Sequence, residues 1–510
     1  MVGQHSSAGG MAALVSSMEI QVAVATFIAS FATIKLFRYF QSNNNAAPGP
    51  WGYPVLGHLP LLGTEPHVTF QKLRMKFGDV FRIQLGTWPA LVINGKKAIK
   101  EALVEQGDAF SGRPQFYTTS SSVLYDGQGV SFSQFSQDYL RHRKMANKVL
   151  ATFANAKSNP MEEAIHREID TVVDSFASKR GTSFCPHDDV FLAAGSIIYQ
   201  ICYGRQEDIR ERTDFTDFIL QSKEFTETVS TGNPIDIFPW LRFVIPWTLT
   251  NFRRLIKKFI ESRKKKVEEH VTTFDRNHLR DATDGFVDIV DSNSEDVQVL
   301  GSARIFSTID DLFGAGFGTV ATTMEWATMY MADNPQVQAK VQQEIDDVVG
   351  PSRRPTLEDR GKMVYTEACI HEIMRITALA PLSLPHYTTT DITFQGYSVK
   401  KDTVVFINLY SMSHDPDVWG DPEVFRPERF LDSSGQINKA LLEEFLPFAT
   451  GRRKCLGEFL GRMEIFLFFT GLLQKCSFSR PPEVAEYDYG VGVGFVRNPK
   501  PFDVQVTLRY

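Results

Sequence analysis

One cysteine, Cys455, lies in a run of residues suited to holding a metal cofactor, Phe-Ala-Thr-Gly-Arg-Arg-Lys-Cys-Leu-Gly. A soft thiolate suits iron, and as the axial ligand of a haem it pushes electron density through the metal to favour O–O cleavage. Gly451 and Gly457 permit close backbone approach to a flat macrocycle. Arg453 can offset a haem propionate, and Phe448 can shield the sulfur. The run therefore predicts a haem iron held by Cys455.

The other cysteines show no comparable pattern. They are scattered along the chain without a C-x-x-C spacing, so that neither a zinc site nor a disulfide framework is indicated, and a reducing compartment is expected. Most cysteines are simply buried, and we assign Cys369 and Cys476 to the core. His371 and Glu372 do not begin a zinc-protease helix either, because Arg375 stands where H-E-x-x-H needs a second histidine.

Two charged motifs accompany the cysteine run. Glu372 and Arg375 are three residues apart, so on a helix they share one face and can form a charge-assisted pair. Arg429, in Pro-Glu-Arg-Phe, offers a second guanidinium. The patterns F-x-x-G-x-R-x-C-x-G, E-x-x-R and P-E-R-F together resemble the cytochrome P-450 family, and the resemblance extends from residue 48 to the end of the chain. It implies that the Glu-Arg-Arg cluster stabilises the core around the haem and takes no part in the reaction.

A glycine-rich stretch resembles the long distal helix of this family. In Asp-Asp-Leu-Phe-Gly-Ala-Gly-Phe-Gly-Thr, which ends at Thr319, the threonine matches the family's A-G-x-D/E-T element for O2 activation. Gly318 departs from the element, since it stands where the family usually has the Asp or Glu that is assigned to proton delivery. Water, Asp311 or Thr319 alone must then substitute. Helix-compatible sequence on both sides excludes a nucleotide-binding loop.

The resemblance also supplies candidates for contacts with haem and substrate. The run Tyr-Leu-Arg-His-Arg that ends at Arg143 resembles the family's W-x-x-x-R, which implies that Arg143 is a propionate partner, and His386 resembles another propionate donor. Residues 110–114, 232–242 and 275–284 look most like family one, the aryl-hydrocarbon hydroxylases, with the steroid 17-hydroxylases as the nearest competitor. Family one implies flat, apolar substrates held between aromatic walls. To these walls we assign Phe317, Phe225, Ala315 and Val491.

These residues must be positioned by a mainly helical body. Apolar residues recur with helical spacing from about residue 95 to 380, interrupted at glycine and proline clusters. Val80–Leu85 and Ala90–Ile93 alternate like the strands of a hairpin, and further strands are expected from Thr393 to Ile407 and from Asp503 to Leu508. The expected fold is mainly α with small β-sheets (α+β), the cytochrome P-450 fold, in a single large domain.

The amino terminus is predicted to anchor the protein in a membrane. The run from Ile20 to Leu36 is mostly apolar, and the first 34 residues contain neither lysine nor arginine. This charge bias places the body in the cytosol, and the missing basic region argues against a cleaved signal peptide. We therefore divide the chain into residues 1–45, which hold the tail, the anchor and a polar linker, and a catalytic domain at 46–510. The domain begins with a proline-rich hinge at residues 48–54.

The resemblance, together with the predicted anchor, implies a membrane-anchored haem monooxygenase of the endoplasmic reticulum. It would insert one atom of O2 into an apolar aromatic or steroid-like small molecule. Resemblance to the anchored members of the family implies that electrons come from NADPH through cytochrome P-450 reductase, with cytochrome b5 as a further donor. The reductase would be attracted by a basic surface made of Arg452, Arg453, Lys454, Arg141 and Lys144.

Composition limits the possible partners, and Gly318 leaves alternative functions open. The net charge of −6 argues against a nucleic-acid partner, because a phosphate-binding face shows as a basic excess. The missing acid at Gly318 leaves open an O2-independent haem-thiolate isomerase or dehydratase. A haem carrier or membrane scaffold is the remaining, non-enzymatic alternative.

Overall fold

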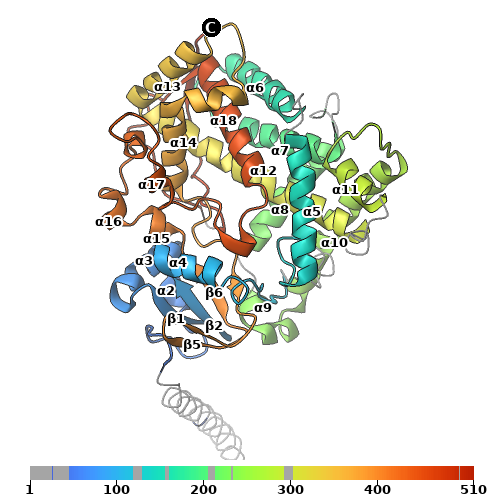
Figure 1. The fold of residues 1–510 in the computed structure, drawn as a ribbon, viewed down its shortest axis with the longest axis vertical. Helices are drawn as coiled ribbons and strands as arrows, with labels where there is room; N and C mark the ends of the chain where they lie inside the picture. Colours follow the sequence, from blue (N-terminus) through green and yellow to red (C-terminus); the bar gives the residue numbers. More distant parts are fainter. Residues whose placement is uncertain are drawn as a thin grey trace, which may run out of the picture.

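Helices form most of the body in the computed structural model, and the largest sheet lies at its lower end (Figure 1). The structure describes residues 26, 45–118, 129–154, 160–204, 209, 213–230, 234–291, 302–492 and 494–510. The expected fold class, mainly α with small β-sheets, is confirmed. All five cysteines are free.

Long helices alternate with short helical turns along the chain. The longer helices are α3 (Pro66–Phe77), α5 (Gln137–Ala154), α6 (Pro160–Ser178), α7 (His187–Tyr203), α8 (Thr213–Ser230), α10 (Pro246–Thr272), α11 (Ala282–Asp291), α12 (Ser302–Asp333), α13 (Pro335–Val348), α14 (Val364–Thr377) and α18 (Glu458–Lys475). The shorter ones are α2 (Leu59–Leu62), α4 (Lys96–Lys100), α9 (Pro234–Ile237), α15 (Tyr410–Ser413), α16 (Pro416–Trp419) and α17 (Lys439–Leu442). Tighter or wider turns are η1 (Glu101–Glu105), η4 (Pro239–Phe243), η6 (Leu357–Lys362), η7 (Pro427–Phe430) and η8 (Gly451–Arg453).

The largest sheet joins the predicted hairpin to two later strands. β1 (Val80–Leu85) and β2 (Trp88–Ile93) pair antiparallel around a tight turn, so the hairpin prediction is confirmed. β6 (Val404–Ile407) pairs parallel with β2, and β3 (His386–Tyr387) pairs antiparallel with β6. The strands expected between residues 393 and 407 therefore do not form one separate set. β6 is apolar along its whole length, which suits a strand with a neighbour on each side.

Two further antiparallel pairs lie in the described part of the chain. β4 (Ile392–Phe394) pairs with β5 (Tyr397–Val399), and β7 (Cys476–Ser479) pairs with β8 (Gln505–Leu508). β8 lies within the range expected near the carboxyl end. β7 was not expected, because it follows α18 directly, and no glycine or proline between them marks the change of structure.

The 32-residue helix α12 runs through the middle of the body, where other helices cover it (Figure 1). It packs on α7, α14 and α18. The contact with α7 is close because residue 316 has no side chain: a Cβ on Gly316 would lie 2.9 Å from Ile198 Cδ1. Further along, the indole N–H of Trp326 donates to the Arg497 carbonyl oxygen (2.7 Å). α12 is thus firmly held, so that its side chains can face an interior site.

A buried ion pair ties α12 to the helices that cover it. Arg263 Nε of α10 lies 2.7 Å from Asp310 Oδ1, with the two side chains 0% and 2% exposed. Arg263 also donates from Nη2 to Ser222 Oγ of α8 (2.6 Å), and its guanidinium lies 4.6 Å from the Phe218 ring centroid. Removing one partner of such a pair costs about 3–5 kcal/mol, because the other charge stays buried alone. α8, α10 and α12 are therefore held in one arrangement.

The proline-rich hinge lies against the first strand. The Pro48 carbonyl oxygen accepts a hydrogen bond from the Arg82 N–H (2.8 Å), and His58 Nε2 lies 2.9 Å from the Pro50 carbonyl oxygen. A Cβ on Gly49 would lie 2.1 Å from the Arg82 carbonyl oxygen, so this approach requires glycine. The hinge is therefore docked on β1 and on the His58 side chain.

The predicted anchor, about residues 20–36, lies outside the described residues apart from Thr26. Among the helices that are described, none combines the length and the apolar character needed to cross a membrane. The predicted chain break at residues 232–234 also begins outside the described part of the chain, and α9 starts at its last residue, Pro234. The structure therefore leaves the anchor as a prediction from the sequence.

Candidate active site

Cys455 lies in the loop between η8 and α18. Its backbone N–H donates to the Phe448 carbonyl oxygen (2.9 Å). Burial raises the pKa of the Cys455 thiol above its usual value, while the Gly457 backbone N–H and nearby cations act in the opposite direction. Protein atoms surround this side chain, and yet it is accessible to solvent. Cys455 is therefore accessible to a bound group.

The two glycines of the cysteine run have different surroundings. Gly451 has a φ of 76°, and a Cβ there would lie 1.9 Å from the Leu103 carbonyl oxygen, so glycine is required where η8 packs on η1. The sequence suggested close approach to a macrocycle at Gly451, whereas the close neighbour is this carbonyl. A Cβ on Gly457 would meet nothing within 4 Å. Gly457 thus has open space on its Cβ side.

α12 presents one accessible face in its otherwise buried middle. Ala315 is exposed, and Asp311, Gly318 and Thr319 are half-buried. On a helix these positions fall along one side, because residues three, four and seven apart lie above one another. A Cβ on Gly314 or Gly318 would meet nothing within 4 Å. This face therefore borders open space, as the cysteine loop does.

The Thr319 hydroxyl is oriented by its own helix. It donates to the Ala315 carbonyl oxygen (2.8 Å) and lies 3.3 Å from the Gly316 carbonyl oxygen. Its proton is therefore held by the helix backbone, while its oxygen lone pairs can accept a hydrogen bond from a molecule in the open space. Thr319 is placed to receive a proton donor on the accessible face.

The structure places one of two substrate candidates of α12 on this face. Ala315 is exposed there. Phe317, two residues on, points to the other side of the helix, because each residue turns the helix by about 100°. Its side chain is 2% exposed, and its ring packs on Phe191 with centroids 5.0 Å apart. Phe317 is therefore part of the core rather than a wall of the accessible space.

The other two substrate candidates lie on separate segments. Val491 is half-buried in a carboxyl-terminal loop, which is tied to α12 by a hydrogen bond from Thr322 Oγ1 to Asn498 Oδ1 (2.8 Å). Thr322 comes one turn after Thr319, so this loop lies next to the accessible part of α12. Phe225 belongs to α8, but its side chain lies outside the described residues.

Three arginines and a histidine gather beside the cysteine loop. Arg453 is buried and donates to the carbonyl oxygens of Ser111 (2.9 Å) and Val130 (3.2 Å). Burial and the positive charge of Arg453 and Arg143 lower the pKa of Arg113 to about 9. Burial and the charge of Arg113 hold the pKa of His386 well below its usual range.

The three arginines form a cation cluster that fits a group carrying carboxylates, and His386, whose pKa is held low, lies neutral beside them. Buried like charges destabilise one another unless an anion lies between them, and a haem carries two propionates. Arg453, Arg143 and His386, the three propionate partners expected from the sequence, are brought together here. Sequence reasoning missed Arg113, because nothing in its own stretch of chain indicates that it packs beside the cysteine run.

A short segment before α5 joins the cysteine loop to α12. Arg453 donates to the Val130 carbonyl oxygen, as above. The backbone N–H groups of Val130 and Ser131 donate to Asp311 Oδ2 at 2.5 and 2.9 Å. On its other side, the Arg453 guanidinium lies 3.9 Å from the Tyr139 ring centroid. These contacts fix the position of the cysteine loop relative to the accessible face of α12.

The structure also brings Glu372, Arg375 and Arg429 together. Arg375 donates to both carboxylate oxygens of Glu372, from Nε (2.7 Å) and Nη2 (2.9 Å), and Arg429 Nε donates to Oε1 (2.9 Å). Arg375 Nη1 reaches the Ser413 carbonyl oxygen (2.8 Å). The cluster connects α14 to η7 and to α15. Its position in the core agrees with a structural role.

The predicted basic surface is smaller than expected. Arg452 and Lys454 are exposed, but each has an acidic partner: Arg452 Nε lies 2.9 Å from Asp108 Oδ1, and Lys454 Nζ lies 2.5 Å from Glu458 Oε2. Arg453 is buried in the cation cluster and does not belong to the surface. Arg141 and Lys144 of α5 are exposed.

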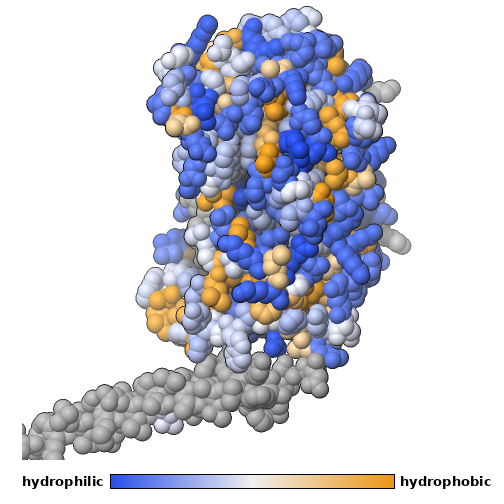
Figure 2. All heavy atoms as spheres, turned by 90° about the vertical axis from the view of Figure 1, so that its left-hand side faces the viewer, coloured by the Kyte–Doolittle hydropathy of each residue, from blue (hydrophilic) through white to orange (hydrophobic). Residues whose placement is uncertain are grey.

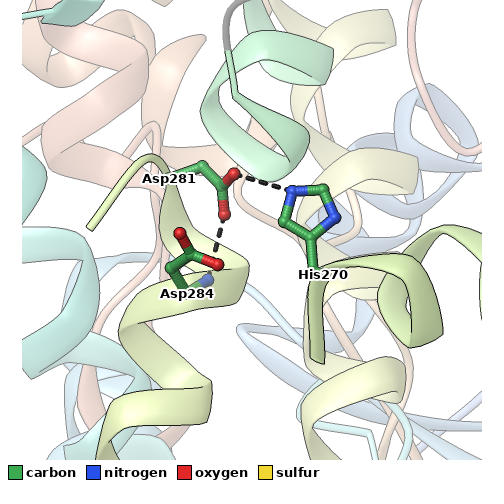
Figure 3. A group of neighbouring side chains, drawn as sticks. All are labelled: His270, Asp281 and Asp284. Carbon is green, nitrogen blue, oxygen red and sulfur yellow. Dashed lines mark hydrogen bonds and ion pairs between the residues drawn. The ribbon is translucent and has the colours of Figure 1, made fainter. Parts of the chain in front are cut away.

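A second cluster of polar side chains lies where α10 meets α11 (Figure 3). His270 donates from Nδ1 to the Lys266 carbonyl oxygen (3.0 Å), and its Nε2 lies 2.8 Å from Asp281 Oδ2. Both ring nitrogens therefore act as donors, which requires an imidazolium. Asp284 accepts a bidentate pair from Arg280 (2.6 and 2.7 Å). Although His270, Asp281 and Asp284 lie close enough to share a metal ion, each already has a protein partner. The cluster is therefore a set of ion pairs that connects α10 to α11.

Replacing His270 with glutamine is expected to remove a pH-dependent part of the stability. Burial lowers the pKa of His270, but the hydrogen bond and charge of Asp281 outweigh it, so the pKa is raised above 6.5. The stabilisation is therefore complete below about pH 6.5, the ordinary pKa of histidine. It is lost as the pH rises through the raised pKa of His270. We expect a cost of about 1.5–3 kcal/mol at pH 6 and a smaller cost at pH 9, measured by thermal unfolding. His278→Gln, at an exposed histidine, is the control, and equal costs of His270→Gln at both pH values would contradict the ion pair.

A helical body with an accessible thiol loop, a buried cation cluster and a central helix open on one face is that of a haem-thiolate oxidoreductase. The sequence pattern of the cytochrome P450 family matches residues 47–506. Rabbit (Oryctolagus cuniculus) cytochrome P450 1A2 is 40% identical over 449 residues, which cover 86% of each chain. Rat (Rattus norvegicus) cytochrome P450 1A1 is 36% identical over 487 residues, which cover 93% of this chain and 92% of the relative.

The chain therefore belongs to the cytochrome P450 family. It is a monooxygenase, an oxidoreductase whose cofactor is a haem held by a thiolate. The family resemblance inferred from the cysteine run is confirmed.

Proposed function

We propose that the protein inserts one oxygen atom from O2 into a flat, apolar small molecule, with Cys455 as the ligand of the haem iron. The observation that carries this proposal is that Cys455 and the Thr319 face of α12 are both accessible and are tied together through residues 130 and 131. The thiolate-bound haem supplies O2 activation. The protein supplies the shape, the charges and the protons around it.

Several side chains are proposed to hold the haem in place. Arg453, Arg143 and Arg113 would bind the propionates, since an anion relieves the mutual repulsion of these cations, with His386 as a further partner. Phe448 would cover the sulfur on the side facing α18, where its ring lies 4.8 Å from the Arg462 guanidinium. The Gly457 N–H, which lowers the pKa of the Cys455 thiol, would stabilise the thiolate.

The substrate is proposed to lie along α12 beside Ala315. The accessible face there carries glycines, an alanine and a threonine, which leave room for a planar molecule. Similarity to cytochromes P450 1A1 and 1A2 supports an apolar aromatic compound, xenobiotic or endogenous, and a steroid of the 17-hydroxylase kind is the second candidate. Val491 and Phe225 stay proposed wall residues on this basis.

The spectrum of the ferrous carbon-monoxide complex is the first test. Coordination by Cys455 predicts the thiolate-type Soret shift. With reductase, NADPH oxidation should rise on addition of an aromatic substrate and give a hydroxylated product. A complex without the shift would overturn the ligand assignment. Conversion of a hydroperoxide without reductant, and no NADPH-dependent product, would favour the isomerase that Gly318 left open.

The hinge end of the catalytic domain, residues 46–510, is proposed to rest on the endoplasmic reticulum membrane. Figure 2 shows hydrophobic patches toward the lower end of the molecule, where Figure 1 places α2 and the β1–β2 hairpin. Trp88 Nε1 of the hairpin donates to the Asp236 carbonyl oxygen (2.6 Å), which brings α9 and η4 to the same end. Exposed apolar side chains in and next to these parts include Trp51, Tyr53, Val55, Leu56, Leu61, Trp240, Phe243, Val244 and Trp247. Aromatic residues of this kind favour a membrane–water interface.

The electron donor is proposed to be NADPH–cytochrome P450 reductase, with cytochrome b5 as a second donor. Arg141, Lys144, Arg452 and Lys454 are exposed close to the cysteine loop and would attract an acidic surface. Because Arg452 and Lys454 already have acidic partners, the attraction is expected to rest mainly on Arg141 and Lys144. Charge reversal at these two residues should raise the reductase concentration needed for half-maximal rate.

A further inference from the structure

Gly318 leaves α12 without an acid next to Thr319. The space beside it is open, since a Cβ on Gly318 would meet nothing within 4 Å, and the same holds for Gly314 one turn earlier. Glycines in a helix also leave backbone carbonyl groups accessible to water. The accessible face of α12 therefore offers room and polar partners for water, but no proton donor at residue 318.

Asp311 lies at the other end of this face. It precedes Gly318 by seven residues, or two turns, so the two point to the same side and are about 10 Å apart along the axis. The carboxylate is fixed, because Oδ2 accepts from the N–H groups of Val130 and Ser131. It is still half-buried rather than enclosed, so it can meet water on the accessible face.

We propose that Asp311 supplies protons to the reaction through water along α12, in place of an acid at residue 318. The inference rests on the proposed function of the Thr319 face. Its geometric basis is one carboxylate, two glycines and one hydroxyl along a single accessible side of the helix. A chain of about three waters spans the 10 Å, with each hydrogen bond close to 2.8 Å.

The charges around Asp311 suit an acid that titrates near neutral pH. Burial raises the pKa of Asp311 to about 6, while hydrogen bonds from Ser131 and Val130 and the charge of Arg453 act against this. The neighbouring carboxylate, Asp310, faces Arg263 instead. A general acid works best when its pKa lies close to the working pH.

The proton balance of the route is simple. The Asp311 O–H bond breaks as its proton passes to a water, and that water gives a proton of its own onward toward Thr319. The carboxylate regains a proton from solvent by way of the Ser131 hydroxyl, which is hydrogen-bonded to it. Overall, substrate RH, O2, NADPH and one proton give ROH, water and NADP⁺. The route carries the protons that leave in that water.

A double-mutant cycle tests the proposal with the haem-loaded, full-length protein and reductase. Asp311→Asn should lower the rate of product formation about 100-fold, the lower end for a general acid, and should divert NADPH electrons to hydrogen peroxide. In the Gly318→Asp background the same change should lower the rate less than about 3-fold, because an acid then stands beside Thr319. Equal losses in both backgrounds, or no loss at all, would overturn the proposal.

Two further measurements separate proton supply from other roles. The infrared spectrum of the resting protein should contain a protonated carboxyl band that Asp311→Asn removes and that fades as pH rises through about 6. This infrared measurement needs no turnover, so its result is independent of the Soret test of Cys455. The substrate dissociation constant should stay the same in Asp311→Asn. An increase that accounts for the lost rate would make Asp311 a substrate-binding residue and sink the inference.

Two control variants show whether a lost rate results from a damaged fold. Asp333→Asn makes the same change on α12, at its far end beside Arg480, and should keep the wild-type rate. Asp311→Glu keeps the acid and should retain at least about a tenth of the rate. If Asp311→Asn yields no haem protein, this second variant decides: loss of coupling there, with normal haem content, would count against the route.

Discussion

Replacing Glu372 with alanine is expected to prevent the protein from accumulating in its folded form. Glu372 and Arg375 are 0% exposed and form a bidentate pair, and Arg429 donates to the same carboxylate. Without Glu372, the Arg375 guanidinium stays buried without this counter-charge. Breaking such a pair costs about 3–5 kcal/mol, a large part of the roughly 5–15 kcal/mol by which folded proteins are stable.

The measurement is the yield of haem-containing protein and its unfolding temperature. Glu367→Ala provides the matched control, because it removes the same side chain from the same helix. Its partner Arg360 is 33% exposed and can turn to solvent, so the expected cost is roughly 0–1 kcal/mol. Similar losses of stability in the two variants would mean that the Glu372 cluster stabilises the fold no more than the Glu367–Arg360 pair does.

Replacing Cys455 with alanine is expected to abolish both the thiolate-type carbon-monoxide spectrum and product formation. The variant removes the only atom of that loop able to give the iron a soft anionic ligand, and with it the electron push that favours O–O cleavage. The loop itself should persist, because the hydrogen bond from the residue 455 N–H to the Phe448 carbonyl oxygen does not use the side chain. Haem content, the spectrum and product are measured on the same preparation.

Cys185→Ala is the control for this variant. Cys185 is also free and exposed, but it lies between α6 and α7, outside the cysteine run. It should keep both the spectrum and the activity. A Cys455→Ala protein with an unchanged Soret shift would show that another residue binds the iron.

Local pattern was enough to predict several elements. The alternating residues at 80–93 form the expected hairpin, because one face of an antiparallel pair is buried and the other is less so. Glu372 and Arg375 meet because three residues make almost one helical turn. In both cases the interacting residues are neighbours in sequence, and the period of the backbone decides which side chains share a face.

Other features depend on parts of the chain that are distant in sequence. β6 joins β2 in parallel across more than 300 residues, and nothing in either strand identifies its partner. Phe317 was assigned to the substrate wall from its type and its helix, whereas α7 covers that side of α12. The side of a helix that is buried is set by what packs on it, which the sequence of one helix does not state.

The same division holds at the site. By itself, the sequence determined the chemistry: a thiolate run at Cys455, a threonine at Thr319 and no acid at Gly318, because residue types and short spacings are local properties. Only the tertiary structure decided that Arg113 joins the cation cluster and that Asp311 shares an accessible face with Gly318. Such contacts result from packing between distant segments, and their energies come from burial and charge that exist only once the chain has folded.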